Sequence, residues 1–168
     1  PWVSIPLSHA VDRIEVMGSD AVVVGAGGSD LHFEAIAFEG ATARIAGHYQ
    51  QRGAAQGESR SHGFFFRQDS PTEGILGLPV GGAGSPGFSE IWQGSASVLF
   101  LQVRSHQFSE VGSLTARNEQ VEDHCVASCA DWYGNARPIF WQGRSFALMG
   151  YELVEGTVAA GRIRERRR

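Results

Sequence analysis

The side chains with the most reactive chemistry are two cysteines, Cys125 and Cys129, spaced C-x3-C. A tetrahedral zinc site needs four ligands, and the histidine beside the pair is His124, so Asp123 or Asp131 would have to complete the set. We therefore expect a disulfide that shapes a long loop, with free thiols and a metal ion as the alternatives. The ring that it closes spans five residues, so the bond would add little to the stability of the fold.

The histidines show no metal-binding pattern in the sequence. The chain contains six of them: His9, His32, His48, His62, His106 and His124. No two are spaced i, i+2 or i, i+4, the spacings that place two ligands on one side of a strand or a helix. His62 opens an apolar run and His32 alternates with apolar residues, so we expect both to be hydrogen-bonded structural side chains. The sequence predicts no metal site and no cofactor.

Motifs of nucleophilic catalysis and phosphate binding are also missing from the sequence. The GSD triplets at 18–20 and 28–30 are typical of hairpin turns and do not match G-x-S-x-G. The glycine-rich stretch 81–87 precedes Phe-Ser-Glu-Ile, whereas a phosphate loop leads into a helix whose N-terminus binds the anion. The sequence also lacks a D-x-D-x-D calcium loop. We therefore expect a protein that is not an enzyme.

Composition and charge narrow the class of protein further. The 168 residues are 42% hydrophobic and 19% charged, which suits one globular domain. All 14 basic residues are Arg, and five lie in residues 162–168, so 9 Arg remain in the body against 17 acidic residues. Such a body repels phosphate, which argues against nucleic-acid binding, and we expect the arginine-rich end to be frayed and solvated. The sequence has no window of 18 apolar residues, so we expect no transmembrane segment.

Strand patterns dominate the chain, and no window has the spacing of an amphipathic helix. Short runs rich in Val, Ile and Phe stand between Gly, Ser, Asp and Pro turns. These runs predict twelve strands in three groups of four, joined mostly by short connections. The expected strands are 11–16, 20–26, 30–38, 41–48, 62–67, 74–80, 95–104, 108–116, 137–142, 144–149, 150–155 and 157–164.

Two features predict that the three groups are blades of a β-propeller. The segments IEVMGSDAVVVGA (14–26) and IFWQGRSFALMGY (139–151) share an order of strand, Gly-centred turn and apolar strand, which indicates a repeat of blade length. Hairpin-connected strands that are apolar throughout must lie between two other sheets, and a stack of blades provides that burial. A β-sandwich or a barrel is the alternative fold. The continuously apolar runs are 21–24, 64–66, 98–101 and 146–149.

We expect one all-β domain, residues 1–168, with four-stranded antiparallel blades at about 11–48, 62–116 and 137–164. Propellers have about four to eight blades, so three blades would form only part of a ring. Residues 2–7 could supply the outer strand of a preceding blade. We expect other polypeptide, of the same protein or of another subunit, to complete the ring through a contact of more than about 1,000 Å².

The middle group of strands carries a family pattern. ESRSHGFFF (58–66), ILGLPV (75–80) and GSASVLFLQV (94–103) together resemble the bacterial secreted proteins with a C-terminal beta-propeller domain. The sequence departs from that pattern at Ser61, where an acid is expected, and at Gly63, where Lys is expected. The resemblance implies an exported, extracellular or periplasmic protein of the cell envelope, without catalytic residues and with a signal segment outside this chain.

In a hairpin-connected blade, alternate connections lie on the same face of the stack. Every expected connection of ten or more residues then falls on one face, and long loops on a rigid scaffold are where binding sites concentrate. Its aromatic, amide and charged side chains suit a partner protein or a glycan, although Trp132 and Tyr133 could instead pack their loop against the fold. The expected binding residues are Glu58, Arg60, Trp92, Asp131, Trp132, Tyr133 and Asn135.

The sequence therefore favours a non-enzymatic binding or scaffold module within a larger exported β-propeller protein or complex. Two alternatives stay open. One is part of a propeller enzyme whose active site lies at the ring axis, and the other is an oligomeric lectin-like or accessory subunit.

Overall fold

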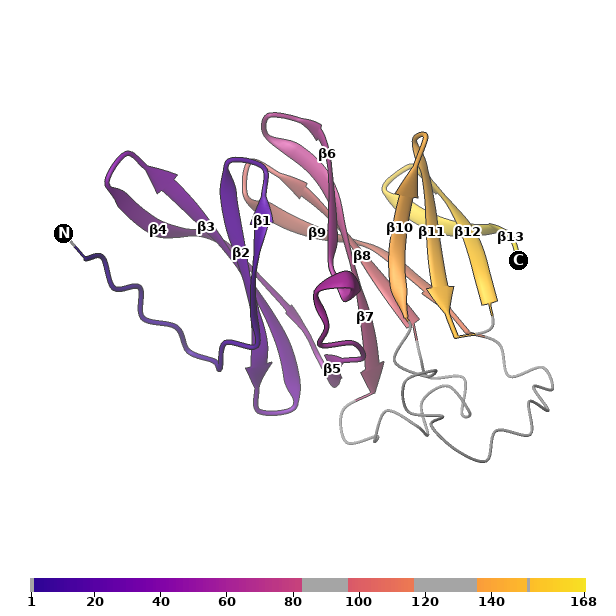
Figure 1. Ribbon diagram of the computed structural model, residues 1–168, viewed down its shortest axis with the longest axis horizontal. Helices are drawn as coiled ribbons and strands as arrows, with labels where there is room; N and C mark the ends of the chain where they lie inside the picture. The colour runs from indigo at the N-terminus through magenta and orange to yellow at the C-terminus, as the bar shows by residue number, and fades with distance from the viewer. Residues whose placement is uncertain (1, 83–96, 117–135, 151) are drawn as a thin grey trace.

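The computed structural model describes residues 2–82, 97–116, 136–150 and 152–168, and these form three antiparallel β-sheets (Figure 1). In the first sheet the strands follow one another in the order of the chain. They are β1 (Arg13–Met17), β2 (Asp20–Gly27), β3 (Asp30–Glu39) and β4 (Thr42–Gln51).

The central sheet is built on three long strands that pair in the order β7, β8, β9. Two shorter strands, β5 and β6, pair with successive parts of the other edge of β7. The strands are β5 (Ala54–Gln56), β6 (Phe65–Ser70), β7 (Glu73–Gly82), β8 (Ser97–Arg104) and β9 (Gln107–Thr115), and a 3-10 turn, η1 (Ser61–Gly63), precedes β6.

The third sheet again has its strands in chain order. They are β10 (Arg137–Trp141), β11 (Arg144–Met149), β12 (Glu152–Ala159) and β13 (Arg162–Arg167). Tight turns close one hairpin of the central sheet and one of the third sheet. Ser105 and His106 form the turn between β8 and β9, and Ala160 and Gly161 form the turn between β12 and β13. Their φ angles are 47° to 71°. Two consecutive residues with positive φ give the turn whose twist matches that of the paired strands.

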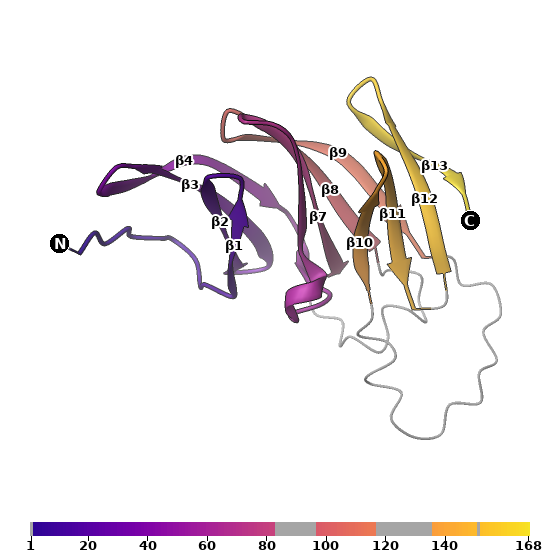
Figure 2. The ribbon, with the colours of Figure 1, turned by 45° about the horizontal axis from the view of Figure 1, so that its top comes forward.

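The three sheets stack face to face with corresponding strands aligned (Figure 2). Along one edge of the stack β1 lies against β6 and β6 against β10, and along the other edge β4 lies against β9 and β9 against β13. Each sheet is formed by one stretch of the chain, and the central sheet contacts both of the others. The described residues do not close into a barrel.

Two apolar cores hold the stack together. Phe33 of the first sheet packs in one core with Leu101 of the central sheet, and Phe100 of the central sheet packs in the other with Met149 of the third sheet. All four side chains are at most 1% exposed. Because β8 contributes neighbouring residues to opposite cores, the central sheet is buried on both faces. Burial of each such side chain stabilises the fold by roughly 1.5–3 kcal/mol.

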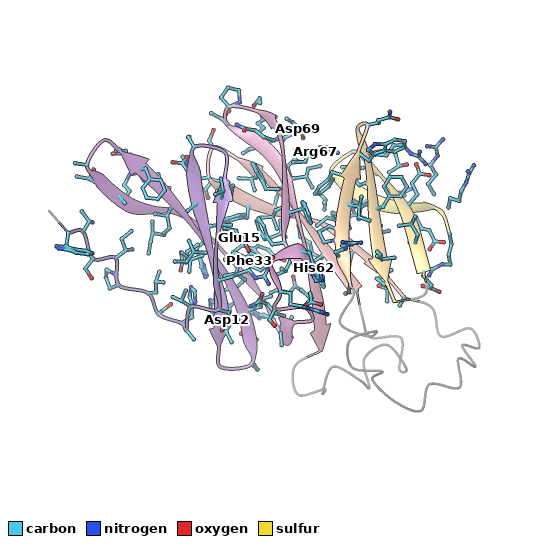
Figure 3. The ribbon with its side chains drawn as sticks, viewed as in Figure 1. Asp12, Glu15, Phe33, His62, Arg67 and Asp69 are labelled. Carbon is cyan, nitrogen blue, oxygen red and sulfur yellow. The ribbon has the colours of Figure 1, made fainter. Side chains whose placement is uncertain are left out.

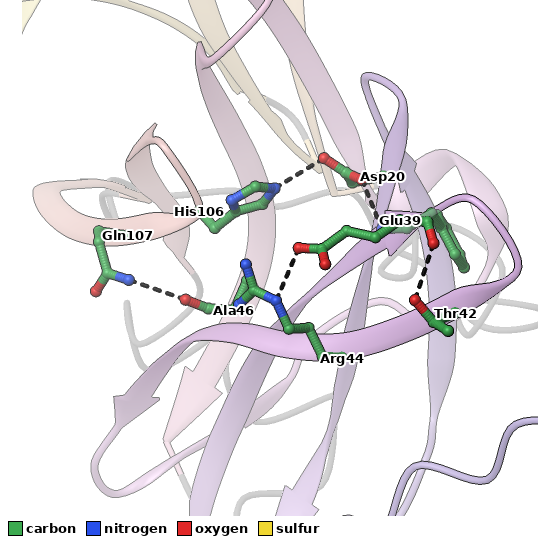
Figure 4. Close-up of polar contacts among 8 residues, drawn as sticks. Asp20, Glu39, Thr42, Arg44, Ala46, His106 and Gln107 are labelled. Carbon is green, nitrogen blue, oxygen red and sulfur yellow. Dashed lines mark hydrogen bonds and ion pairs between the residues drawn. The ribbon is translucent and has the colours of Figure 1, made fainter.

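Polar contacts at the β4–β9 edge join the first sheet to the central sheet (Figure 4). His106 Nε2 lies 2.8 Å from Asp20 Oδ2, and Gln107 Nε2 donates a hydrogen bond to Ala46 O at 3.0 Å. A side chain at Gly47 would place its Cβ 1.9 Å from His106 O. This close approach of two backbones explains the glycine in the interior of β4.

The prediction of an all-β fold is confirmed. Within the described ranges the longest helical element is the three-residue turn η1. No helix in the described part of the chain is long and apolar enough to cross a membrane. One strand was not predicted. Ala54–Gln56 forms β5, whereas the strand pattern predicted a long connection at 49–61.

The arginine-rich end is ordered, which corrects the prediction of a frayed terminus. Arg162–Arg167 forms β13 and pairs with β12. The strand pattern predicted a turn at Gly156, but this glycine lies inside β12. The position requires glycine because a Cβ there would come within 2.8 Å of the Ile163 side chain. The turn is at Ala160 and Gly161, so the last hairpin extends further along the chain than expected.

Two of the four continuously apolar runs, 21–24 and 98–101, are buried throughout. The run 64–66 lies partly in the edge strand β6 and exposes Phe65. In the run 146–149 buried and partly exposed residues alternate. The prediction of burial on both faces is therefore wrong for the run 64–66, which lies at a sheet edge. The run 146–149 lies on an outer sheet, and its burial on both faces would require a further polypeptide.

Candidate functional site

Two residues of the predicted binding face, Glu58 and Arg60, lie between β5 and η1. The guanidinium of Arg60 donates to both carboxylate oxygens of Glu58, at 3.0 and 2.9 Å, and the Arg60 backbone N–H donates to the same carboxylate at 2.8 Å. His62 Nε2 lies 3.5 Å from it. The structure therefore brings Glu58 and Arg60 together as a bidentate ion pair, the strong geometry for such a pair.

Arg13 of β1 extends this cluster to the first sheet. Its Nη2 donates to the backbone carbonyls of Glu58 and Arg60, both at 3.0 Å, and its Nη1 lies 3.5 Å from Glu15 Oε1. Figure 3 shows Glu15 and His62 on the two sides of this junction. Burial lowers the pKa of Arg13, an effect that the neighbouring carboxylates of Glu15 and Glu58 oppose.

The electrostatics of Glu58 point to an anchoring role. Burial raises the pKa of this carboxyl group, but the hydrogen bonds from Arg60 outweigh burial and bring the pKa below its ordinary value. The carboxylate is therefore ionised at neutral pH, with its oxygens bound by donors. Such a group fixes the conformation of the segment after β5, which Arg13 joins to the first sheet, and it is a poor general base.

The other predicted site residues lie outside the described part of the chain. The same holds for the two cysteines and the disulfide expected between them. The residues concerned are Trp92, Asp131, Trp132, Tyr133 and Asn135 of the binding face, with Cys125 and Cys129.

A cleft of about 160 Å³ opens between the first and central sheets. Asp20 and His106 face it from opposite sheets, and their side chains bind one another at 2.8 Å. Burial raises the pKa of Asp20, but hydrogen bonds from the Phe38 backbone N–H and from His106 bring it below its ordinary value. The pair therefore joins the two sheets across the cleft.

The outer face of the third sheet is open in the described residues. Trp141 is 56% exposed and Leu153 is 52% exposed. Phe146 and Leu148 of β11 are partly exposed, and the strand register places Leu148 opposite Leu153. Since side chains alternate between faces along a strand, these four share one face of the sheet.

A charged group lies on the same outer face. The guanidinium of Arg144 binds both carboxylate oxygens of Glu155, at 2.9 and 2.8 Å, and Arg166 Nη1 donates to Glu155 at 3.0 Å. Arg144 also lies over the Phe146 ring, 4.7 Å from its centre. The hydrogen bonds from Arg144, opposed by burial and helped by Arg166, lower the pKa of Glu155 to about 2.

The outer face of the first sheet is partly covered by residues 2–12, which we call the strap (Figure 1). Ile5 and Leu7 of the strap pack against an apolar cluster of that face that includes Val23. The strap contains no strand, so the stretch 2–7 is not paired as part of a further sheet here. The two outer sheets thus differ in whether their outer face is covered.

Backbone hydrogen bonds fasten the end of the strap to β2. The backbone N–H groups of Ala10 and Asp12 donate to the carbonyls of Ala26 and Val24, both at 3.0 Å, and Asp12 Oδ2 accepts from the Ala26 N–H at 3.1 Å. A Cβ at Gly25 would lie 1.7 Å from Ala10 O. Glycine at this position of β2 therefore permits the strap to lie directly on the sheet.

Three histidines and a glutamate come together beneath the strap, and we call them the histidine cluster: His9, His32, Glu34 and His48. The His9 ring stacks on the His32 ring at 5.0 Å, and His32 Nδ1 lies 3.2 Å from His48 Nε2. Glu34 Oε1 lies 3.7 Å from His9 Nε2 and 4.0 Å from His48 Nε2. This cluster is the main feature that the sequence analysis missed.

His9 is the buried member of the cluster. Its side chain is 0% exposed, and Glu34 is 7% exposed. His9 Nδ1 lies 2.7 Å from the Ala10 carbonyl, which can only accept, so Nδ1 carries the proton. His9 Nε2 is buried and lacks a hydrogen-bond partner among the described residues. No set of three or more His, Cys, Asp or Glu side chains in the described ranges has an arrangement that could hold a metal ion.

A β-bulge explains why the sequence did not reveal the cluster. Near the β3–β4 turn, Ile36 pairs with Ile45, but beyond a shift in register Glu34 pairs with His48. Without that shift His48 would lie opposite Phe33 and would point to the other face of the sheet. The i, i+2 spacing of His32 and Glu34 was a usable signal, whereas His9 comes from a segment without secondary structure.

A scan of family models, a search of curated proteins and a search of solved structures each found no match to this chain.

Proposed function

We propose that the chain is a non-enzymatic binding or scaffold module whose three sheets are blades of a larger β-propeller. The ring is completed by other polypeptide, and the assembly is exported. In this proposal the outer sheets are interaction surfaces, and the long connections on one face of the stack bind a protein or a glycan.

The order of the sheets supports the assignment to blades. Strands that are consecutive in the chain pair antiparallel in both outer sheets and from β6 to β9 of the central sheet, and corresponding strands lie along the same edge of the stack. In a two-layer sandwich each sheet has one solvated face, whereas here the central sheet is buried on both faces. A sheet between two others is the unit from which a ring of blades is built.

The observation that carries the proposal is the open outer face of the third sheet. Trp141 and Leu153 are more than half exposed there, beside Phe146 and Leu148. On the opposite face of the same sheet, Met149 and Val154 are buried against the central sheet. A second sheet on the outer face would bury the exposed apolar group as the central sheet buries the inner one.

The occupant that we propose is a further antiparallel sheet with an apolar face. A second copy of this chain offers one, because the outer face of its first sheet exposes Ile14, Val16 and Phe38. Two copies would give six sheets, within the range of about four to eight blades. Such a contact would bury more than about 1,000 Å² in total, as a specific interface requires.

Sedimentation velocity of residues 1–168 at micromolar concentration tests the proposal. We expect a species larger than the 18.1 kDa chain. Replacing both Trp141 and Leu153 by Ser should shift the population to monomer without unfolding it, because both side chains are solvent-exposed in the single chain. Phe65→Ser is the matched control, since Phe65 is an exposed apolar side chain of the central sheet and not of the third.

A cooperative, well-folded monomer at these concentrations would contradict assembly between copies. The same chain is then sedimented with a candidate partner sheet, either fused to it or mixed with it. Association would show that a partner of different sequence is needed, whereas a lack of association would favour a chain that needs no partner. If the double variant associates as strongly as the wild type, the third sheet is not part of the interface.

A further inference from the structure

We propose that the strap is released from the first sheet by protonation of the histidine cluster. The strap is docked when all three imidazoles are neutral or when one of them is protonated. It detaches as the remaining imidazoles become protonated. Release would be a response to mildly acidic pH, because imidazoles change charge between about pH 5 and pH 8.

The cluster can compensate one positive charge. His9 already uses its Nδ1–H for the Ala10 carbonyl, so an added proton goes to Nε2, 3.7 Å from the Glu34 carboxylate. A single proton at His9 therefore forms an ion pair with Glu34. This pair gives the buried imidazolium a counter-charge, and it favours the docked strap.

The second and third protons are not compensated in this way. The contact between His32 Nδ1 and His48 Nε2, at 3.2 Å, needs one nitrogen as the acceptor, and that acceptor is lost when both rings are protonated. His32 stacks on His9 at 5.0 Å and on His48 at 5.5 Å, so three imidazolium rings would repel one another at close range. Only His9 can leave without breaking the sheet, because it belongs to the strap.

Two aspartates of the strap and of β3 have hydrogen-bond partners of their own. From the strap, Asp12 accepts from the Ala26 N–H and from Gln56 Nε2. From β3, Asp30 accepts from the Gly53 N–H at 2.8 Å and from a Gln50 side chain. The Gly53 hydrogen bond is the main reason why the pKa of Asp30 is low, and His32 adds only a small effect. β2 contributes glycines and apolar residues to this region, and β4 contributes His48.

Release would uncover an apolar sheet face. Ile5 and Leu7 would leave Val23 and Ile36, next to Ile14 and the other exposed apolar residues of the same face. Under the proposed function, on which this step alone depends, the part of that face beneath the strap then becomes available to another sheet as well. Protons would in this way enlarge the apolar face that the first sheet offers to a ring.

Hydrogen exchange of the intact chain measures release directly. The probe is the peptide that contains the Ala10 and Asp12 amides, both of which donate to β2. Its protection, corrected for the intrinsic effect of pH, should fall between about pH 7.5 and about pH 5, by about tenfold per pH unit for each extra proton bound. A peptide from β8 should stay protected, which shows that the sheets remain folded.

Two histidine variants separate the cluster from general acid effects. His48→Gln removes one titrating ring that is 44% exposed, so the fold should tolerate it, and release should become shallower and move to lower pH. His106→Gln is the matched control, because His106 lies at the β4–β9 edge with Asp20 and should leave strap release unchanged.

Three outcomes would overturn the proposal. The first is strap protection that does not change over this pH range. The second is the same pH dependence in His48→Gln as in the wild type. The third is a strap whose protection responds to one equivalent of Zn²⁺ and is insensitive to protons, which would make the cluster a metal site. Sedimentation under the same conditions tests ring assembly separately, since the strap can open whether or not copies associate.

Discussion

The two outer sheets have the same strand order but different outer faces. The first sheet carries the strap and the histidine cluster, whereas the third sheet presents Trp141 and Leu153 to solvent in the described residues. Their inner faces are alike, since each packs large apolar side chains against the central sheet. The difference teaches that the inner faces determine the fold, and that the outer faces are free to acquire separate interactions.

The largest effect should come from an inner face. Phe33→Ala removes a ring that is 0% exposed between the first and central sheets, and we expect a loss of about 3–5 kcal/mol in the free energy of unfolding. Phe146→Ala, on the outer face of the third sheet, should cost less than about 1.5 kcal/mol. Urea unfolding measures both, and equal losses would show that the third sheet is covered on both faces.

A smaller effect should follow from blocking the strap. Gly25→Val places side-chain atoms where Ala10 O now lies, so the strap should leave β2 at every pH, at a cost of about 1–3 kcal/mol. The Ala10 amide should lose its protection while the β8 amides keep theirs. Gly57→Ala is the control, because a Cβ there makes only an ordinary contact of 3.4 Å, and retention of the strap in Gly25→Val would disprove its direct backbone contact.

On the third sheet, the carboxyl group of Glu155 should make the free energy of unfolding depend on pH in the acidic range. The pKa of Glu155 falls from 4.5 to about 2 on folding, so its contribution is complete above pH 4.5 and is lost as the pH falls toward 2. In Glu155→Gln the free energy of unfolding should therefore vary less over this range than in the wild type. Parallel curves for variant and wild type would mean that the arginines do not hold this carboxylate in solution.

The smallest effect should come from the solvent-exposed pair of Arg44 and Glu39 on the first sheet. Their side chains are joined at 2.9 Å, yet both are more than half exposed. Arg44→Gln should change the free energy of unfolding by less than about 0.5 kcal/mol. Chemical denaturation at two salt concentrations checks this, and a larger loss would reveal a further role of Arg44.

The sequence was informative where local rules decide the structure. Apolar runs between turn residues predicted most strands, and the continuous run 98–101 correctly indicated a strand buried on both faces. Gly156 misled the prediction because its role is to make room for Ile163, a residue of the neighbouring strand. A glycine required by packing and a glycine required by a turn look the same in one sequence.

The candidate sites depended more on contacts between distant residues. Glu58 and Arg60 are two residues apart, and their pairing is local. The histidine cluster joins His9 to residues of β3 and β4 through the path of the strap and a bulge in register. Neither feature has a signature in local sequence, which is why the histidines appeared isolated.

The formation of each sheet from one stretch of chain also has a consequence for how the molecule unfolds. A linear stack in which each sheet touches only its neighbours behaves as a one-dimensional array, in which stability is a sum of units and of the interfaces between them. The central sheet has two such interfaces and each outer sheet has one. Opening should therefore begin at the ends of the array and reach the central sheet last, so that native-state exchange separates the chain into three cooperative units.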